Sequence, residues 1–160
     1  MESRYFKKAT QYDQMASLMA DKENWSAPTM LLIEHAIECY VASILEAASG
    51  KSVYDIYPRG EVPHKSWRML YDAKDYLREQ GALKTLPYNR TLPKEIEWAF
   101  YTYDFFRFPK DEGKAYSTKE ESDIRDAMDT LNILREYTKE FLNNYERFLE
   151  NQKESDDMEI

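Results

Sequence analysis

The chain has 160 residues, about the size of one domain, and its 42% apolar residues suffice for a single hydrophobic core. Its 4 Gly and 6 Pro are too few for an all-β fold with many tight turns. The net charge of −8 argues against strong non-specific binding of nucleic acids, which depends on neutralising phosphates, and one cysteine allows no intrachain disulfide.

The first fifty residues predict two helices. Apolar side chains recur at helical spacing over residues 3–23. A second helix is expected over 27–48, between Ser26 as its N-cap and Gly50 as its C-cap. Because polar residues are sparse over 27–48, this helix should lie at the centre of its bundle.

Three more helices are expected in the rest of the chain. The predicted segments are a loop over 51–63 and helices over 65–80, about 91–106 and 118 to about 149. Aromatic side chains on more than one face of the helix over 91–106 indicate deep burial or contact with another subunit. Residues 151–160 are acidic and are predicted to be a disordered tail. The sequence therefore predicts an all-α, up-and-down bundle of about five helices, in one domain over residues 1–150.

Basic residues are concentrated in three stretches of this acidic chain. Residues 51–68, 84–94 and 107–119 together carry a net charge of +7, so the remainder carries −15. The stretch 84–94 holds three basic residues and no acidic one. A local basic face is therefore compatible with the negative total charge.

Two of the predicted loops carry the best candidates for a binding site. In an up-and-down bundle alternate loops share an end, so the loop after the second helix should approach the loop after the fourth. Arginine presents a fork of hydrogen-bond donors and a protonated histidine also donates, which suits a phosphate or another anion. The predicted ligand-binding residues are Arg59, His64, Arg107, Lys110 and Lys114.

Three pieces of the sequence occur in an order that resembles a known family. They are the segment EHAIECYVA from Glu34 to Ala42, His64 followed by Leu70, and FRFP ending at Pro109. Over roughly residues 25–150 they are similar to the HEPN (higher eukaryotes and prokaryotes nucleotide-binding) family. The resemblance implies a HEPN-like homodimer that binds a nucleotide, RNA or a partner protein such as a nucleotidyltransferase. It also implies a role in a toxin–antitoxin, phage-defence or stress system.

The chain departs from the RNA-cleaving members of that family. Those members carry an Arg, four to six residues and then a His, usually on a late helix. The helix over 118–149 contains no His, and Arg59 and His64, the pair at that spacing, lie in a loop rich in Pro and Gly. Ala42 stands where the family has a Lys. We therefore expect a non-catalytic binding module; the alternatives are a metal-independent endoribonuclease using Arg59 and His64, and a purely structural or interaction bundle.

Other polar residues of the second helix are expected to be structural. His35 should be a core histidine paired with a Tyr or Glu, and Cys39 a buried thiol. Glu34 and Glu38 lie one turn apart, but a carboxylate metal site needs Glu and Glu-x-x-His sets from several helices, so no metal or cofactor is expected. Without a signal-peptide pattern or a long apolar run, the protein is predicted to be cytoplasmic and not in a membrane.

Overall fold

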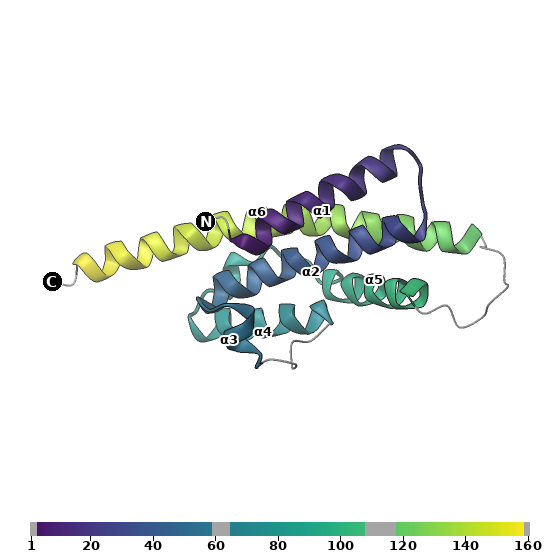
Figure 1. The fold of residues 1–160 in the computed structure, drawn as a ribbon. Coiled ribbons are helices and arrows are strands. Elements are labelled where there is room, and N and C mark those ends of the chain that lie inside the picture. Colours follow the sequence, from purple (N-terminus) through teal and green to yellow (C-terminus); the bar gives the residue numbers. More distant parts are fainter. Residues whose placement is uncertain (1–2, 59–64, 108–117, 159–160) are drawn as a thin grey trace.

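The computed structural model describes residues 3–58, 65–107 and 118–158, apart from the side chains of residues 107, 118 and 119. Within these residues every regular element is a helix, which confirms the predicted all-α bundle (Figure 1). In chain order the elements are α1 (Arg4–Asp21), α2 (Ala27–Ser49), α3 (Val53–Ile56), α4 (Ser66–Glu79), the 3-10 helix η1 (Leu83–Thr85), α5 (Leu92–Arg107) and α6 (Thr118–Met158).

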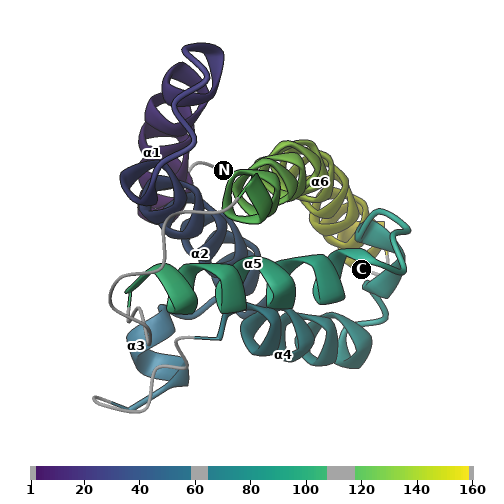
Figure 2. The same cartoon turned by 90° about the vertical axis from the view of Figure 1, so that its right-hand side faces the viewer.

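Helix α2 is the centre of the bundle, as its sparse polar residues predict. It packs against α1, α4, α5 and α6, and 13 of its 23 residues are buried (Figure 2). Tyr40, Ile44 and Leu45 are among its fully buried side chains. Burial of such side chains stabilises a fold by about 1.5–3 kcal/mol each, so α2 contributes much of the hydrophobic stabilisation.

Capping residues explain where several helices begin and end. The Ser3 hydroxyl accepts a hydrogen bond from the Phe6 amide at 3.1 Å and caps α1. Gly50 adopts the left-handed conformation, φ 71°, at the end of α2, which confirms the predicted C-cap. Ser26 occupies the predicted N-cap position of α2, but its side chain makes no capping hydrogen bond.

The direction of α4 departs from a strict up-and-down order. Gln80, directly after α4, donates from Nε2 to the carbonyl of Ala48 near the end of α2, at 2.7 Å. The C-terminal ends of α2 and α4 therefore meet, and the connection over residues 50–65 does not simply reverse the chain. Part of this connection, predicted as a loop, forms α3, whose Val53 amide donates to Glu46 Oε2 at 3.0 Å.

Helix α6 is longer than predicted. It continues through Met158, so residues 151–158 are helical where we expected a disordered tail. The physical reason is that no Gly or Pro interrupts residues 118–158, and Glu, Gln and Lys favour helix even when they are exposed. The C-terminal part of α6 projects beyond the bundle (Figure 1), and residues 149–158 are exposed. Among the described residues no helix has both the length and the apolar composition needed to cross a bilayer.

Candidate functional site

The residues predicted from the two loops lie mostly outside the described residues. This applies to Arg59, His64, Lys110 and Lys114, and to the side chain of Arg107, whose backbone ends α5. The helices that lead to these loops are described. The Trp67 ring in the first turn of α4 packs on the Phe100 ring of α5, with centroids 5.3 Å apart. The start of α4 and the second half of α5 therefore lie side by side (Figure 2).

The described side chains form a different basic site, between α4, α6 and the segment that precedes α5. One hollow of about 710 Å³ is lined by Lys74 and Arg78 of α4, by Lys84 and Arg90, and by residues of α6. A second hollow of about 600 Å³ shares Lys84 and Asn144 with the first and adds Arg147. We call these two adjoining hollows the basic cleft.

Local hydrogen bonds hold the segment that carries Lys84 and Arg90. Gly81 ends α4 in the left-handed conformation, φ 70°, which a residue with a side chain rarely adopts. Asn144 of α6 donates from Nδ2 to the Thr85 carbonyl at 3.2 Å. The Asn89 side chain accepts hydrogen bonds from the Thr91 and Leu92 amides and caps α5. The segment is thus fastened to α6 at one end and to α5 at the other.

The basic cleft carries a surplus of positive charge. Its lining contains five cationic residues and a single acidic residue, Glu140. Arg78 pairs with exposed Asp75 at 2.8 Å, and burial together with repulsion from Arg78 lowers the pKa of Lys74. An anion bound beside Lys74 would relieve this repulsion. The five cationic residues are Lys74, Arg78, Lys84, Arg90 and Arg147.

The cleft also presents two tyrosines with contrasting exposure. Tyr88 is 86% exposed, so both faces of its ring are accessible to a stacking partner. Tyr137 is buried, and burial raises its pKa to about 12, which keeps its hydroxyl neutral. The arrangement combines donors for phosphate oxygens with a platform for a planar group.

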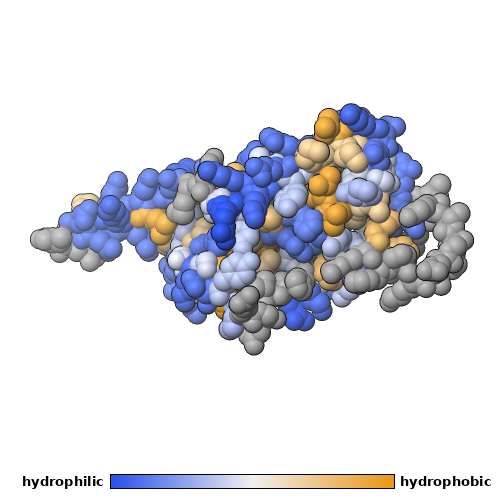
Figure 3. Space-filling model, in the orientation of Figure 1, coloured by the Kyte–Doolittle hydropathy of each residue, from blue (hydrophilic) through white to orange (hydrophobic). Residues whose placement is uncertain are grey.

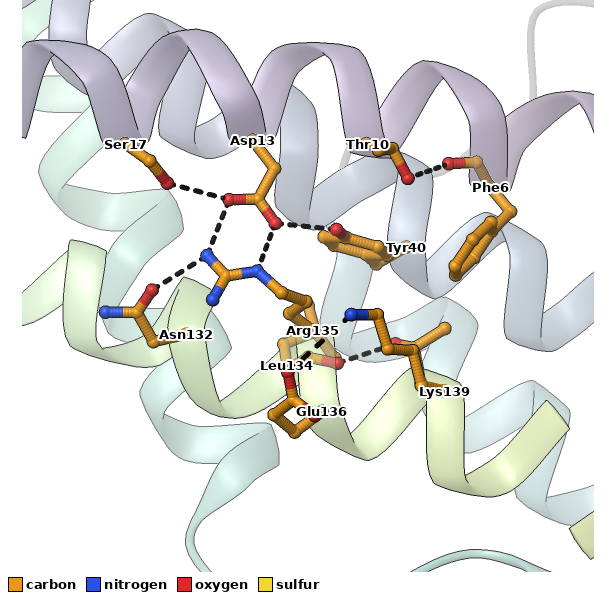
Figure 4. Close-up of polar contacts among 11 residues, drawn as sticks. Phe6, Thr10, Asp13, Ser17, Tyr40, Asn132, Leu134, Arg135, Glu136 and Lys139 are labelled. Carbon is orange, nitrogen blue, oxygen red and sulfur yellow. Dashed lines mark hydrogen bonds and ion pairs between the residues drawn. The ribbon is translucent and has the colours of Figure 1, made fainter. Parts of the chain in front are cut away.

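A second polar cluster joins α1, α2 and α6 (Figure 4). Arg135 donates from Nε and Nη2 to the two carboxylate oxygens of Asp13, at 2.6 Å each. The Tyr40 hydroxyl donates to the same carboxylate at 2.6 Å, and the Ser17 hydroxyl at 3.2 Å. Burial alone would raise the pKa of Asp13, but these hydrogen bonds and the charge of Arg135 lower it overall. The Asp13 carboxylate thus accepts four hydrogen bonds, from donors on α1, α2 and α6, and ties these three helices together.

Three other residues singled out in α2 have structural surroundings. His35 is only partly buried and so is not the core histidine that we expected; its ring stacks on the Tyr12 ring with centroids 5.3 Å apart, and burial lowers its pKa. Burial raises the pKa of Cys39 to about 11, so its thiol is protonated. Glu34 is only 1% exposed, and neither of its carboxylate oxygens has a hydrogen-bond partner. Burial and repulsion from Glu38 raise the pKa of Glu34 well above its usual range.

The basic cleft was not identified from the sequence, although one signal of it was present. The stretch 84–94 is basic without any acidic residue, and Lys84 and Arg90 belong to it. The cations of α4 and α6 join them only through tertiary packing. In the described residues no group of three or more His, Cys, Asp or Glu could hold a metal ion. No protein-family model matches the chain, and neither a curated protein nor a solved structure is significantly similar to it.

Proposed function

We propose that this protein is a cytoplasmic, non-catalytic, HEPN-like helical module that binds a segment of single-stranded RNA in the basic cleft. The observation that carries the proposal is the gathering of five cationic side chains around one acidic residue, on a chain whose net charge is −8. Such a surplus attracts a polyanion in spite of the total charge. The module would serve a toxin–antitoxin, phage-defence or stress system, as the HEPN resemblance implies.

Two features favour an RNA segment over a single nucleotide. The basic cleft consists of two hollows joined at Lys84, so cations in both can contact successive phosphates. The exposed ring of Tyr88 can stack on an unpaired base, the usual way in which proteins hold single strands. A mononucleotide would leave the cations of one hollow without a ligand.

Binding of a labelled RNA of twelve nucleotides, measured by fluorescence anisotropy in EDTA, tests the proposal. Combining Lys84→Glu with Arg90→Glu should weaken binding by roughly tenfold or more. The slope of log affinity against log salt should fall by roughly 0.7 for each phosphate that the variant no longer neutralises. The matched control combines Lys7→Glu with Lys8→Glu, two exposed lysines of α1 outside the cleft. Equal weakening in both double variants would refute the cleft as the binding site.

The same labelled RNA, incubated with the wild type and with His64→Ala, tests the alternative of a metal-independent ribonuclease. If Arg59 and His64 act on RNA, the wild type will shorten the labelled RNA in EDTA and His64→Ala will not. Intact RNA with both proteins, together with binding that depends on the cleft, is the outcome that we expect. If RNA is neither bound nor cut, a partner protein such as a nucleotidyltransferase becomes the better hypothesis for the ligand.

We also propose that the module is a homodimer. Figure 3 shows apolar residues gathered over α1 and the adjoining part of α2, where Met15, Leu18 and Leu31 are 51%, 46% and 43% exposed. Contiguous apolar surface of this kind is typical of an interface between subunits. Light scattering should give twice the monomer mass for the wild type and the monomer mass for Leu18→Glu combined with Leu31→Glu. A monomeric wild type would refute the dimer.

A further inference from the structure

The outward face of α5 carries large aromatic side chains. Trp98, Tyr101 and Phe105 are 64%, 49% and 53% exposed. Their spacing of three and four residues places them on one stripe of the helix. Single exposed apolar residues are normal on protein surfaces, but a row of aromatic rings marks a surface that contacts another molecule.

A groove of about 470 Å³ runs beside this stripe, between α5 and α6. Trp98 belongs to both the stripe and the groove lining. The lining also includes the small buried residues Ala99 and Ala127, and Ile133, which is 40% exposed. The apolar part of an amphipathic segment therefore has a place to insert next to an exposed indole ring.

The polar part of the groove is rich in acidic residues. Its lining includes Glu95 of α5 and three aspartates of α6, and it contains no basic residue. Asp123, Asp126 and Asp129 follow one another at intervals of three residues, so each carboxylate lies about 4.5 Å further along the helix axis. None of the three is paired with a cation in the part of the chain that the structure describes. Complementary charge requires a basic occupant.

A second copy of this chain that docks by the same face would not supply that charge. In a symmetric dimer the same patch meets itself, so two acidic grooves would face each other and repel. We propose that the groove between α5 and α6 docks a basic amphipathic segment of another protein. Its apolar side chains pack on the aromatic stripe, and its Lys or Arg side chains pair with Asp126 and Asp129. This surface is separate from the basic cleft, so the inference goes beyond the proposed function.

The test uses a fluorescein-labelled peptide of fourteen residues, with Leu on one face of a helix and Lys on the other. Its binding is measured by fluorescence anisotropy. Combining Asp126→Asn with Asp129→Asn should weaken peptide binding by roughly tenfold, because two ion pairs can no longer form. Trp98→Ala should weaken it as well, because the indole ring offers the peptide an apolar surface and a cation–π partner. The matched control combines Asp156→Asn with Asp157→Asn on the exposed end of α6, and it should bind within about twofold of the wild type.

Three outcomes would overturn the proposal. The groove and control variants could weaken binding equally, which would show that the net charge of the protein attracts the peptide. A peptide with all Leu replaced by Ser could bind as tightly, which would exclude an amphipathic occupant. Light scattering could show that the peptide converts a dimer of the protein into monomers, in which case the groove is occupied by a second copy. Circular dichroism of each variant would establish that the helices remain folded.

Discussion

The buried carboxyl of Glu34 should make the protein less stable as the pH rises above the ordinary pKa of a glutamate. Burial and repulsion from Glu38 raise the pKa of Glu34 in the folded protein well above the ordinary value of 4.5. Below pH 4.5 the carboxyl is protonated in both the folded and the unfolded state, so Glu34 causes no loss in the free energy of unfolding. As the pH rises, the unfolded chain ionises first, so the folded state loses stability until the pH passes the folded-state pKa.

The size of this effect follows from one proton. Between the two pKa values the unfolded chain has released a proton that the folded chain retains, so the free energy of unfolding falls by at most about 1.4 kcal/mol per pH unit. From pH 5 to pH 7 the loss is therefore up to about 2.7 kcal/mol. Glu34→Gln keeps the shape of the side chain but cannot ionise. It therefore removes the contribution of residue 34 to the pH dependence of stability without creating a cavity.

Urea unfolding followed by circular dichroism at pH 5, 6 and 7 measures the difference. We expect the stability of Glu34→Gln relative to the wild type to increase with each step in pH. Glu150→Gln, on the exposed end of α6, should follow the wild type at every pH. If Glu34→Gln and the wild type lose stability in parallel, Glu34 is ionised in the folded protein and the reasoning from its burial is wrong.

Four further predictions concern other residues. Asp13→Ala should lower the free energy of unfolding by about 2–4 kcal/mol, measured in urea, because it leaves the partly buried charge of Arg135 unpaired. Because the pKa of Asp13 is lowered in the folded state, its ionised carboxylate stabilises the fold at pH values above the ordinary pKa of 3.8, and this stabilisation is lost as the pH falls through the lower folded-state pKa. Acid unfolding of Asp13→Asn should not show this loss of stability. Cys39, with a pKa of about 11, should resist alkylation at pH 8 until urea unfolds the protein. Ending the chain after Glu150 should leave the melting temperature within about 2 °C of that of the full chain, because residues 151–158 are exposed and none belongs to the hydrophobic core.

Helical periodicity predicts the long helices because amphipathic segments must bury one face, and Gly50 marks the end of α2 because its left-handed backbone favours glycine. The sequence misses α3, which has only four residues and depends on a bond from the Val53 amide to Glu46. It also misplaces the end of α6, since a composition that suits disorder also suits an exposed helix. An up-and-down order would make α2 and α4 antiparallel, but their C-terminal ends meet where Gln80 donates to the carbonyl of Ala48. This contact joins residues that are far apart in the chain, so no local sequence pattern predicts it.

The site was harder to predict than the fold. The predicted site consists of basic residues from two loops, and Arg59, His64, Lys110 and Lys114 stay predictions because they lie outside the described residues. The basic cleft instead joins cations from α4, α6 and the segment before α5, which are distant in the chain. Spacing along one helix cannot reveal such a meeting; only the packing of α4 and α6 against that segment can.

The ion pair between Asp13 and Arg135 sets an order for folding during synthesis. Its two residues are separated by 122 positions, so at ribosomal rates the arginine is made roughly 6–24 s after the aspartate. Until then α1 can pack on α2, the helix that it contacts most, and the Asp13 carboxylate has Tyr40 and Ser17 as partners but no cation. The ion pair that joins the first long helix to the last can therefore form only after most of the chain has been synthesised.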